Sequence, residues 1–263
     1  ADQLTGPWTV HPPGSLQLSE SHFPTKAPPA PWWGVARIRV LAALAGIELP
    51  HDLAEELTAP HIASPDVHVD HAEHRIVMYF HGLEDFARQV TRVATSTDGV
   101  RFEARPEILG KTYFRAFPHG DHIYAMAMPG QFYRSEDGLG AFEAGPRLFN
   151  KNMRHAALLT RGETLFVFWT QVGDAPERIL LSTIDLAAPW EEWAESSPVE
   201  VLRPERPWEG AEAPLEPSIR SVASGHPNQL RDPAIFEEDG RTFLLYAVAG
   251  ESGLAIAEVH LER

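Results

Sequence analysis

"NQLRDPAIFEEDGRTFLLYAVAGESGLAIAEV", residues 228–259, contains three apolar runs separated by short polar turns. The runs are rich in β-branched and aromatic residues and alternate with polar ones, a pattern typical of half-buried strands. Asp239 and Gly240 lie between the first two runs and predict a tight turn, because Asp-Gly suits the backbone of two-residue hairpins. The stretch therefore predicts three antiparallel strands in succession. Arg231 and Asp232 directly precede the first of them.

The same pattern occurs three more times upstream. Each copy joins apolar runs through turns that contain Gly or Asp, and the copies cover residues 64–104, 112–146 and 153–186. They recur roughly 40 residues apart, which is the span of a four-stranded propeller blade. The sequence therefore predicts an all-β protein, a β-propeller with four recognisable blades.

We expect one propeller domain over residues 1–263, with a helical insertion at 30–58 and a long loop insertion at 189–229. The last copy of the repeat has only three strands. Residues 1–18 resemble the end of a third strand, a turn and an outer strand, so they either close the ring against the last blade or are the remnant of a partial N-terminal blade. We favour the remnant, on which reading the intact parent has five blades.

Composition excludes several classes of function. The 263 residues contain 22 Lys plus Arg against 37 Asp plus Glu, a formal charge of −15, which repels nucleic acid and anionic membrane surfaces. Cysteine is absent, so no disulfide or thiolate chemistry is available. No stretch approaches the roughly 20 apolar residues of a membrane span. We expect a soluble protein, cytoplasmic or periplasmic, that binds neither nucleic acid nor membrane; its oligomeric state stays open.

Candidate site residues follow from the blade pattern, because the first strand of each blade lines the central channel and begins at one of its mouths. Aligning the turns puts Tyr113, His155 and Pro233 in register, with Arg154 level with Asp232. The set expected around that mouth is Asp66, His68, Tyr113, Arg115, Arg154, His155, Arg231 and Asp232. The alternative is that the charges only join neighbouring blades, as pairs such as Arg231–Asp232 and Arg154–Asp66.

The segments "RDPAIFEEDGRTFLLYAVAG", "SPDVHVD" and "ATSTDG" resemble the blade signatures of the five-bladed β-propeller glycoside hydrolases, the superfamily of arabinanases, β-xylosidases, invertases and mannoside phosphorylases. The resemblance covers roughly residues 60–263, and the chain looks like an uncharacterised bacterial branch of that superfamily. It implies an oligo- or polysaccharide substrate.

The resemblance also implies a catalytic arrangement, in which two carboxylates flank the glycosidic bond and a third tunes the acid. In the family pattern the base begins the first blade, the tuning Asp the second and the acid Glu the third. Asp66 matches the second-blade Asp, whereas Tyr113-Phe114-Arg115 stands where the Glu is expected. Glu177 and Glu216, which lie on loops, are candidates for the missing acid or for substrate contacts.

Arg115, Arg154 and Arg231 favour an anionic sugar, since guanidinium groups bind carboxylate, sulfate or phosphate bidentately. The leading hypothesis is a glycosidase that uses Asp66, His155 and Asp232 near the reaction centre. One alternative is a uronate lyase in which Tyr113 and His155 transfer protons; another is a noncatalytic sugar-binding propeller.

We expect no cofactor and no zinc site, because a hairpin turn would direct the histidines of residues 71–74 away from the channel. Channel carboxylates could hold a hard cation such as Ca²⁺, although no spacing in the sequence supports one. Tryptophans in the two insertions, Trp32, Trp33, Trp190, Trp193 and Trp208, are either a sugar-stacking rim or hydrophobic plugs for long loops.

Overall fold

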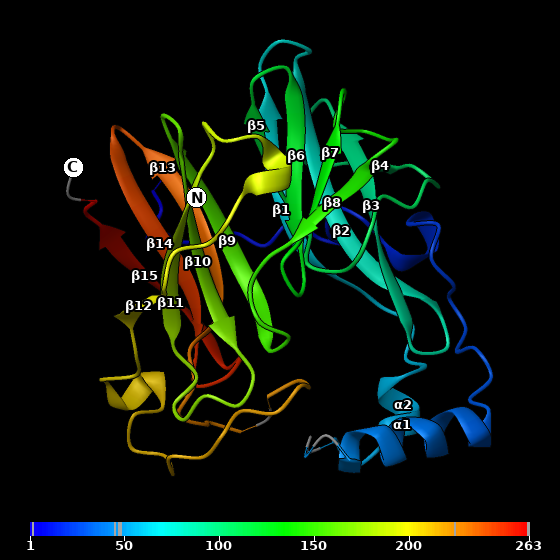
Figure 1. The fold of residues 1–263 in the computed structure, drawn as a ribbon. Helices are drawn as coiled ribbons and strands as arrows, with labels where there is room; N and C mark the ends of the chain where they lie inside the picture. The colour runs from blue at the N-terminus through cyan, green and yellow to red at the C-terminus, as the bar shows by residue number, and fades with distance from the viewer. Residues whose placement is uncertain (2, 45, 47–48, 224, 262–263) are drawn as a thin grey trace.

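A computed structural model describes residues 1, 3–44, 46, 49–223 and 225–261. The described chain forms four antiparallel sheets arranged as the blades of a propeller, as predicted (Figure 1). In each sheet the strands follow one another in chain order, so every connection within a blade is between adjacent strands. The first strand of each blade is the innermost, and these four inner strands face one another.

The blades agree closely with the predicted repeats. Blade 1 contains β1 Ile62–Asp70, β2 Arg75–Asp85, β3 Arg88–Ser96 and β4 Glu103–Ala104. Blade 2 contains β5 Arg115–His119, β6 His122–Ala127, β7 Gln131–Ser135 and β8 Glu143–Arg147. Blade 3 contains β9 Met153–Arg161, β10 Thr164–Gln171, β11 Ile179–Asp185 and β12 Val199–Leu202. Blade 4 contains β13 Arg231–Glu238, β14 Arg241–Val248 and β15 Gly253–Val259.

The predicted turn at Asp239-Gly240 is confirmed. Glu238 pairs with Arg241 across it, and both turn residues have positive φ, 51° for Asp239 and 74° for Gly240. Those signs define the two-residue turn whose twist matches antiparallel strands. The turn therefore sets the register of the hairpin and places Arg231 and Asp232 at its opposite end.

Three apolar clusters hold neighbouring blades together. One packs Tyr79 of blade 1 against Phe114 at the start of blade 2, the next packs Phe132 of blade 2 against Trp169 of blade 3, and the third packs Phe168 of blade 3 against Tyr246 of blade 4. Among the described residues no comparable cluster joins blade 4 to blade 1. The ring is therefore packed along three of its four blade boundaries.

The N-terminal segment differs from the expected outer strand, since the described residues of 1–18 form no strand. Pro7, Pro12 and Pro13 lack the N–H that a strand ladder needs, which explains the absence of pairing. The end of the segment lies against blade 1, where the Phe102 N–H donates to the Ser15 carbonyl. Within the described chain, β15 pairs with β14 only, and its Leu254 is 81% exposed.

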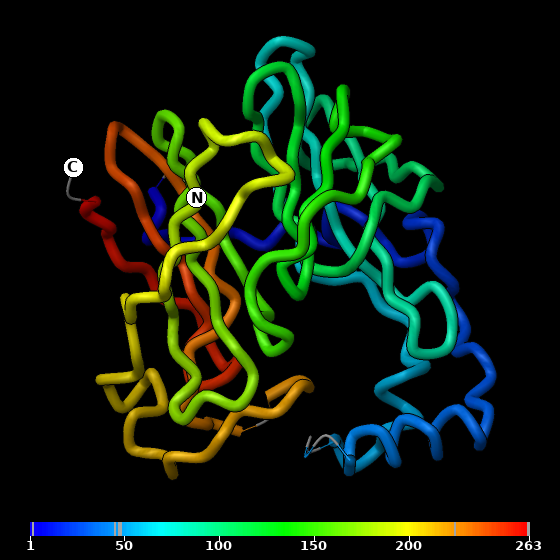
Figure 2. Tube along the Cα trace, in the orientation of Figure 1, coloured from blue at the N-terminus to red at the C-terminus, as the bar shows by residue number. Residues whose placement is uncertain are grey.

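The short η1 Leu18–Glu20 precedes the first insertion, which contains the helices α1 Trp32–Leu44 and α2 Leu53–Glu56. None of the helices in the described ranges is both long and apolar enough to cross a membrane. Residues 203–223 of the second insertion lie at the same end of the molecule as α1 and α2 (Figure 2). A hydrogen bond from Ser221 Oγ to Glu56 Oε2, 3.1 Å, connects the two insertions there.

The second insertion is only partly a loop. It contains η2 Trp190–Glu192, η3 Pro207–Glu209 and β12, which completes blade 3. Trp190 and Trp193 are buried between blades 2 and 3, so these two indoles act as hydrophobic plugs. Trp32, Trp33 and Trp208 are exposed. The proposed aromatic rim is thus reduced to three indoles.

Candidate functional site at the channel mouth

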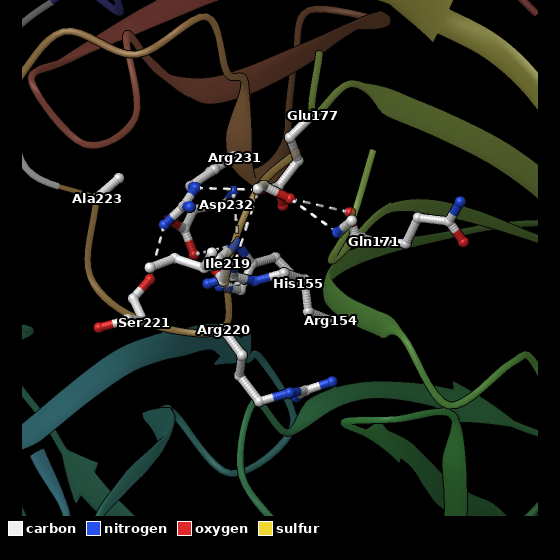
Figure 3. A network of polar contacts seen from close by, with 12 residues as sticks. Arg154, His155, Gln171, Glu177, Ile219, Arg220, Ser221, Ala223, Arg231 and Asp232 are labelled. Carbon is white, nitrogen blue, oxygen red and sulfur yellow. Dashed lines mark hydrogen bonds and ion pairs between the residues drawn. The ribbon is translucent and has the colours of Figure 1, made fainter. Parts of the chain in front are cut away.

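The four inner strands enclose a cavity of about 560 Å³. Its wall includes Asp66 and His68 on β1, Arg115 on β5, Ala157 on β9 and Ala234 on β13. Because one strand of every blade contributes, this cavity is the central channel that the blade pattern predicts. Figure 3 shows the cluster of polar residues at the end where β9 and β13 begin.

The inner strands depart from regular geometry at this mouth. Between Ala63 and Asp66, between Met153 and Ala156, and between Arg231 and Ala234, two residues face one residue of the neighbouring strand. Such bulges re-aim side chains and often lie beside functional sites. Counted from the hairpin turns, where Arg161 pairs with Thr164 and Glu238 with Arg241, Arg154 is level with Arg231 and not with Asp232, so the expected register is one residue off.

The backbone conformation at the strand starts shows that the register expected for Tyr113 is also off by one residue. Ser64, Tyr113 and Asp232 have positive φ of 51°, 55° and 46°, a backbone that costs energy for residues other than glycine. Tyr113 is therefore level with Asp232 and not with Pro233. A shared strained conformation at three strand starts marks this mouth as the place where the fold departs from regular strand structure.

Asp232 and His155 are in direct contact across blades 3 and 4 (Figure 3). His155 Nδ1 lies 3.2 Å from Asp232 Oδ1, and Arg154 Nε donates to His155 Nε2 at 3.2 Å. The Asp232 N–H also donates to His155 Nδ1, at 3.3 Å. Both ring nitrogens of His155 therefore face an N–H donor, and the Asp232 carboxylate lies beside Nδ1.

The surroundings keep His155 neutral. Burial lowers the pKa of His155 well below its ordinary value, and the charges of Arg154, Arg231 and Arg115 lower it further. Nε2 faces Arg154 and Nδ1 faces the Asp232 N–H, so both ring nitrogens are already in contact with protein donors. These surroundings do not favour the proton-transfer role predicted for His155.

Asp232 has the properties of a general acid. Burial raises its pKa to about 6, the nearby Glu251 carboxylate acts in the same direction, and Arg154, Arg115 and Arg231 oppose the rise. The Asp232 side chain retains 34% exposure, so it reaches solvent at the mouth. A carboxyl that stays partly protonated near pH 6 and reaches solvent can donate a proton to a bound ligand.

The pKa of Asp66 is shifted in the opposite direction to that of Asp232. Its Oδ2 accepts from His68 Nε2 at 2.7 Å and from the Ala116 N–H at 2.8 Å. Although burial raises the pKa of Asp66, the charge and hydrogen bond of His68 outweigh that effect, and Arg115 also lowers it. Asp66 is therefore ionised where Asp232 tends to stay protonated. Two carboxyl groups with opposite shifts are a common signature of paired acid and base roles.

The three predicted arginines are mainly structural. Arg115 donates to the carbonyls of Ser64, Phe114 and Ala156 at 2.9–3.2 Å, so it joins blades 1, 2 and 3. Its side chain is almost fully buried. Arg115 also lines the channel, but its donors are directed to the backbone.

Glu177 pairs with the other two arginines in the interior. Its Oε2 lies 3.1 Å from Arg231 Nε and 3.6 Å from Arg154 Nη1. Glu177 is 0% exposed and Arg231 1% exposed. Arg231 additionally contacts Glu251 and the Ser221 carbonyl, each at 3.0 Å. Arg231 and Glu177 are too buried to touch a substrate in this conformation, so the prediction that they contact substrate is corrected. They form a buried ion pair beneath the residues of the mouth.

Tyr113 lies between two histidines. Its ring centroid is 4.7 Å from that of His81 and 4.8 Å from that of His155. Burial raises the pKa of Tyr113, with Asp232 adding to the rise, which is the opposite of what a proton-transferring tyrosine needs. The pKa shifts of Tyr113 and His155 therefore both disfavour the lyase hypothesis. The Tyr113 ring packs against the His155 ring.

Three contributors were not among the predicted residues: His81, Glu251 and Arg220. His81 comes from the second strand of its blade, Glu251 from the turn before β15, and Arg220 from the second insertion. Only the positions at strand starts carried a signal in the sequence, so contributors from other places were missed. The predicted Glu216 is exposed on the second insertion, and its role stays a prediction.

The described residues contain no group of three or more His, Asp or Glu side chains arranged to hold a metal ion. The carboxylates near the mouth are engaged by His or Arg partners, as Asp66 is by His68 and Glu177 by Arg231. The donor set therefore does not fit a calcium site, which would need several oxygen ligands directed to one point.

The fold is a propeller of the type found in glycoside hydrolases of known structure. A thermostable family-43 glycoside hydrolase matches with a TM-score of 0.55 at 16% identity, over 77% of this chain and 70% of the other. A protein described with the GH130 family of mannoside phosphorylases matches with a TM-score of 0.54 at 11% identity, over 81% and 69%. The Cellvibrio cellulosa α-L-arabinanase bound to arabinohexaose matches with a TM-score of 0.50 at 10% identity, over 77% and 75%. These likenesses establish the fold.

A sequence relative defines the family more narrowly. The uncharacterized protein R118 of Acanthamoeba polyphaga mimivirus is 35% identical over 277 aligned positions, which cover 98% of this chain and 71% of R118. The chain belongs to the same family as R118. No model of a known protein family matches the chain. The relative is viral, so the expected bacterial origin has no support.

Proposed function

We propose that this protein is a glycoside hydrolase whose reaction centre is the channel mouth, with Asp232 as the general acid and Asp66 as the ionised partner. The observation that carries the proposal is the contact between Asp232 and a neutral His155, in a site where the pKa of Asp232 is raised to about 6. The fold shared with glycosidases supports a carbohydrate substrate.

In this proposal each oxygen of the Asp232 carboxyl has its own role. Oδ1 lies 3.2 Å from His155 Nδ1, and Oδ2 carries the proton. Oδ2 transfers that proton to the glycosidic oxygen as the bond from this oxygen to the anomeric carbon breaks. The nearby positive charges of Arg154, Arg115 and Arg231 stabilise the carboxylate that forms during the step.

Asp66 completes the reaction from the facing blade. Its Oδ2 is held by His68 and the Ala116 N–H, so Oδ1 faces the ligand. This oxygen removes a proton from water as the water attacks, or itself attacks the anomeric carbon to form an intermediate that water hydrolyses. In both cases one water is consumed and a reducing end is released.

The test is a screen of glycans in which new reducing ends are measured for the wild type and for Asp232→Asn and Asp66→Asn. Asparagine tolerates the positive φ of Asp232, so this change removes ionisation without adding backbone strain. We expect each variant to lose about 100-fold or more of the activity, a typical share for an acid or base.

Asp239→Asn is the matched control, because Asp239 also has positive φ and lies on the far turn of the same hairpin. It should retain wild-type activity. Binding without turnover by the wild type would contradict the hydrolase and identify a sugar-binding propeller instead. Wild-type rates in Asp232→Asn would remove Asp232 from the mechanism.

A further inference from the structure

The second insertion crosses the channel mouth as a short strap, residues 218–223. Arg154 Nη1 donates to the Ile219 carbonyl at 3.1 Å, and Arg231 Nη1 donates to the Ser221 carbonyl at 3.0 Å. Ser221 Oγ reaches Glu56 of α2. The strap is thus held on both sides by residues of the described chain, and the two buried arginines fix its backbone directly above Asp232 and His155 (Figure 3).

Arg220 is the side chain that this strap presents to the open side of the mouth. In Figure 3 it extends away from the buried arginines towards the neighbouring blades. Its Nη2 donates to the Lys151 carbonyl at 3.2 Å, and its Nη1 lies 3.6 Å from Met128 Sδ, a weak acceptor. A guanidinium has five N–H groups, so these two contacts leave donors unused.

The charge of Arg220 is not neutralised locally. Within the described part of the chain, no carboxylate lies at ion-pair distance from its guanidinium. Burial lowers the pKa of Arg220, the positive charge of Arg154 lowers it further, and the more distant Tyr113 and Glu177 offset only part of this effect. By contrast, Arg154 and Arg231 share Glu177, and Arg231 also meets Glu251. Arg220 is therefore an exposed positive charge at the mouth, although the protein as a whole has a formal charge of −15.

We propose that Arg220 is a specificity residue that binds an acidic group carried by the sugar, such as the carboxylate of a uronic acid. The inference rests on the proposed function, because it takes the ligand at this mouth to be a saccharide. A guanidinium fork binds a carboxylate through two parallel hydrogen bonds, which is more than the neutral C6 hydroxymethyl group of the matching hexose can offer. A free oxyanion such as inorganic phosphate presents the same chemistry.

The test compares Arg220→Gln and Arg220→Lys with the wild type on pairs of oligosaccharides that differ only in a uronic acid or the matching neutral hexose. We expect Arg220→Gln to lower kcat/KM for the acidic member about 10- to 100-fold through KM, the range of one charge-assisted contact, and to leave the neutral member almost unchanged. Arg220→Lys should recover part of the loss, because a lysine keeps the charge but not the fork.

Arg203→Gln is the matched control, since Arg203 is an exposed arginine that pairs with Glu200 of β12 at the outer side of blade 3. It should leave both substrates unaffected, and thermal unfolding should show that all variants stay folded. Equal losses on acidic and neutral substrates, or no loss on either, would overturn the inference.

Two further measurements separate this inference from the proposed function and from a free anion. Calorimetric titration of Asp232→Asn with acidic oligosaccharides tests binding without turnover; weaker binding after Arg220→Gln supports the inference even if no hydrolysis is found. Inorganic phosphate is then titrated into assays on neutral substrates. The inference fails if phosphate alters the rate and Arg220→Gln abolishes that effect without changing the ratio of acidic to neutral activity. In that case the anionic group bound by Arg220 is not carried by the sugar.

Discussion

Asp232 depends on one close contact and on the charges around it. His155 Nδ1 lies 3.2 Å from Asp232 Oδ1, and the charge of Glu251 adds to the effect of burial on the pKa of Asp232. Arg154 acts on both residues, because it donates to His155 Nε2 and its charge lowers the pKa of both. A single buried arginine is thus coupled to both members of this pair.

Replacement of Glu251 tests that electrostatic balance. An acid must be protonated to work, so activity should fall as the pH rises through the pKa of Asp232, at about 6. Glu251→Gln removes a negative charge that raises this pKa, so the alkaline limb of the kcat/KM profile should move to lower pH. The profile is measured with the substrate found in the screen. A limb that stays in place, or moves to higher pH, would contradict the assigned role of Glu251.

Sequence reasoning at the residue scale recovered Asp66, His155 and Asp232 as neighbours of one mouth, because strand starts are recognisable. The proton transfer predicted for His155 and Tyr113 is disfavoured by their surroundings. A ring nitrogen occupied by Arg154, or a phenol packed between two histidines, depends on contacts between blades that the local sequence does not encode.

At the scale of elements, the Glu177 cluster connects β11, β9, β13 and the strap. Glu177 precedes β11 and meets arginines at the starts of β9 and β13. Neither carboxylate oxygen of Glu177 forms a well-aligned hydrogen bond, so opposite charge holds this cluster together. Breaking a buried pair leaves uncompensated charges and is strongly destabilising.

Glu177→Gln should therefore lower the free energy of unfolding by about 3–5 kcal/mol, because two buried guanidinium groups lose their shared anion. Urea denaturation measures the change. Glu237→Gln is the control: its exposed pair with Arg161 should contribute about 1 kcal/mol or less. Similar losses for both variants would mean that the buried cluster does not stabilise the boundary between blades 3 and 4.

The elements themselves were largely predictable, with instructive exceptions. Inner hairpins such as β13 and β14 combine apolar alternation with a strong turn signal. β12 was missed because it is a short outer strand with little burial, inside an insertion rich in Pro and Glu. The strand expected within residues 1–18 does not form, since the prolines outweigh the apolar pattern there.

At the scale of the whole molecule, the inner strands bring three catalytic candidates, Asp66, His155 and Asp232, to the same end of a channel, and the strap adds the exposed Arg220. The fold explains why the set is scattered in sequence from Asp66 to Asp232: each blade contributes the start of its first strand. The propeller was predictable because its repeats carry redundant signals. The strap was not, because a unique insertion has no repeat with which it can be aligned.

The central claim is that Asp232 protonates the leaving group, and this is tested most directly by varying that group. Wild type and Asp232→Asn are compared on aryl glycosides of one sugar whose phenols range from weakly to strongly acidic. A strongly acidic phenol leaves without a proton, so the deficit of Asp232→Asn should shrink from about 100-fold or more towards none along the series. A deficit of constant size across the series would contradict the claim.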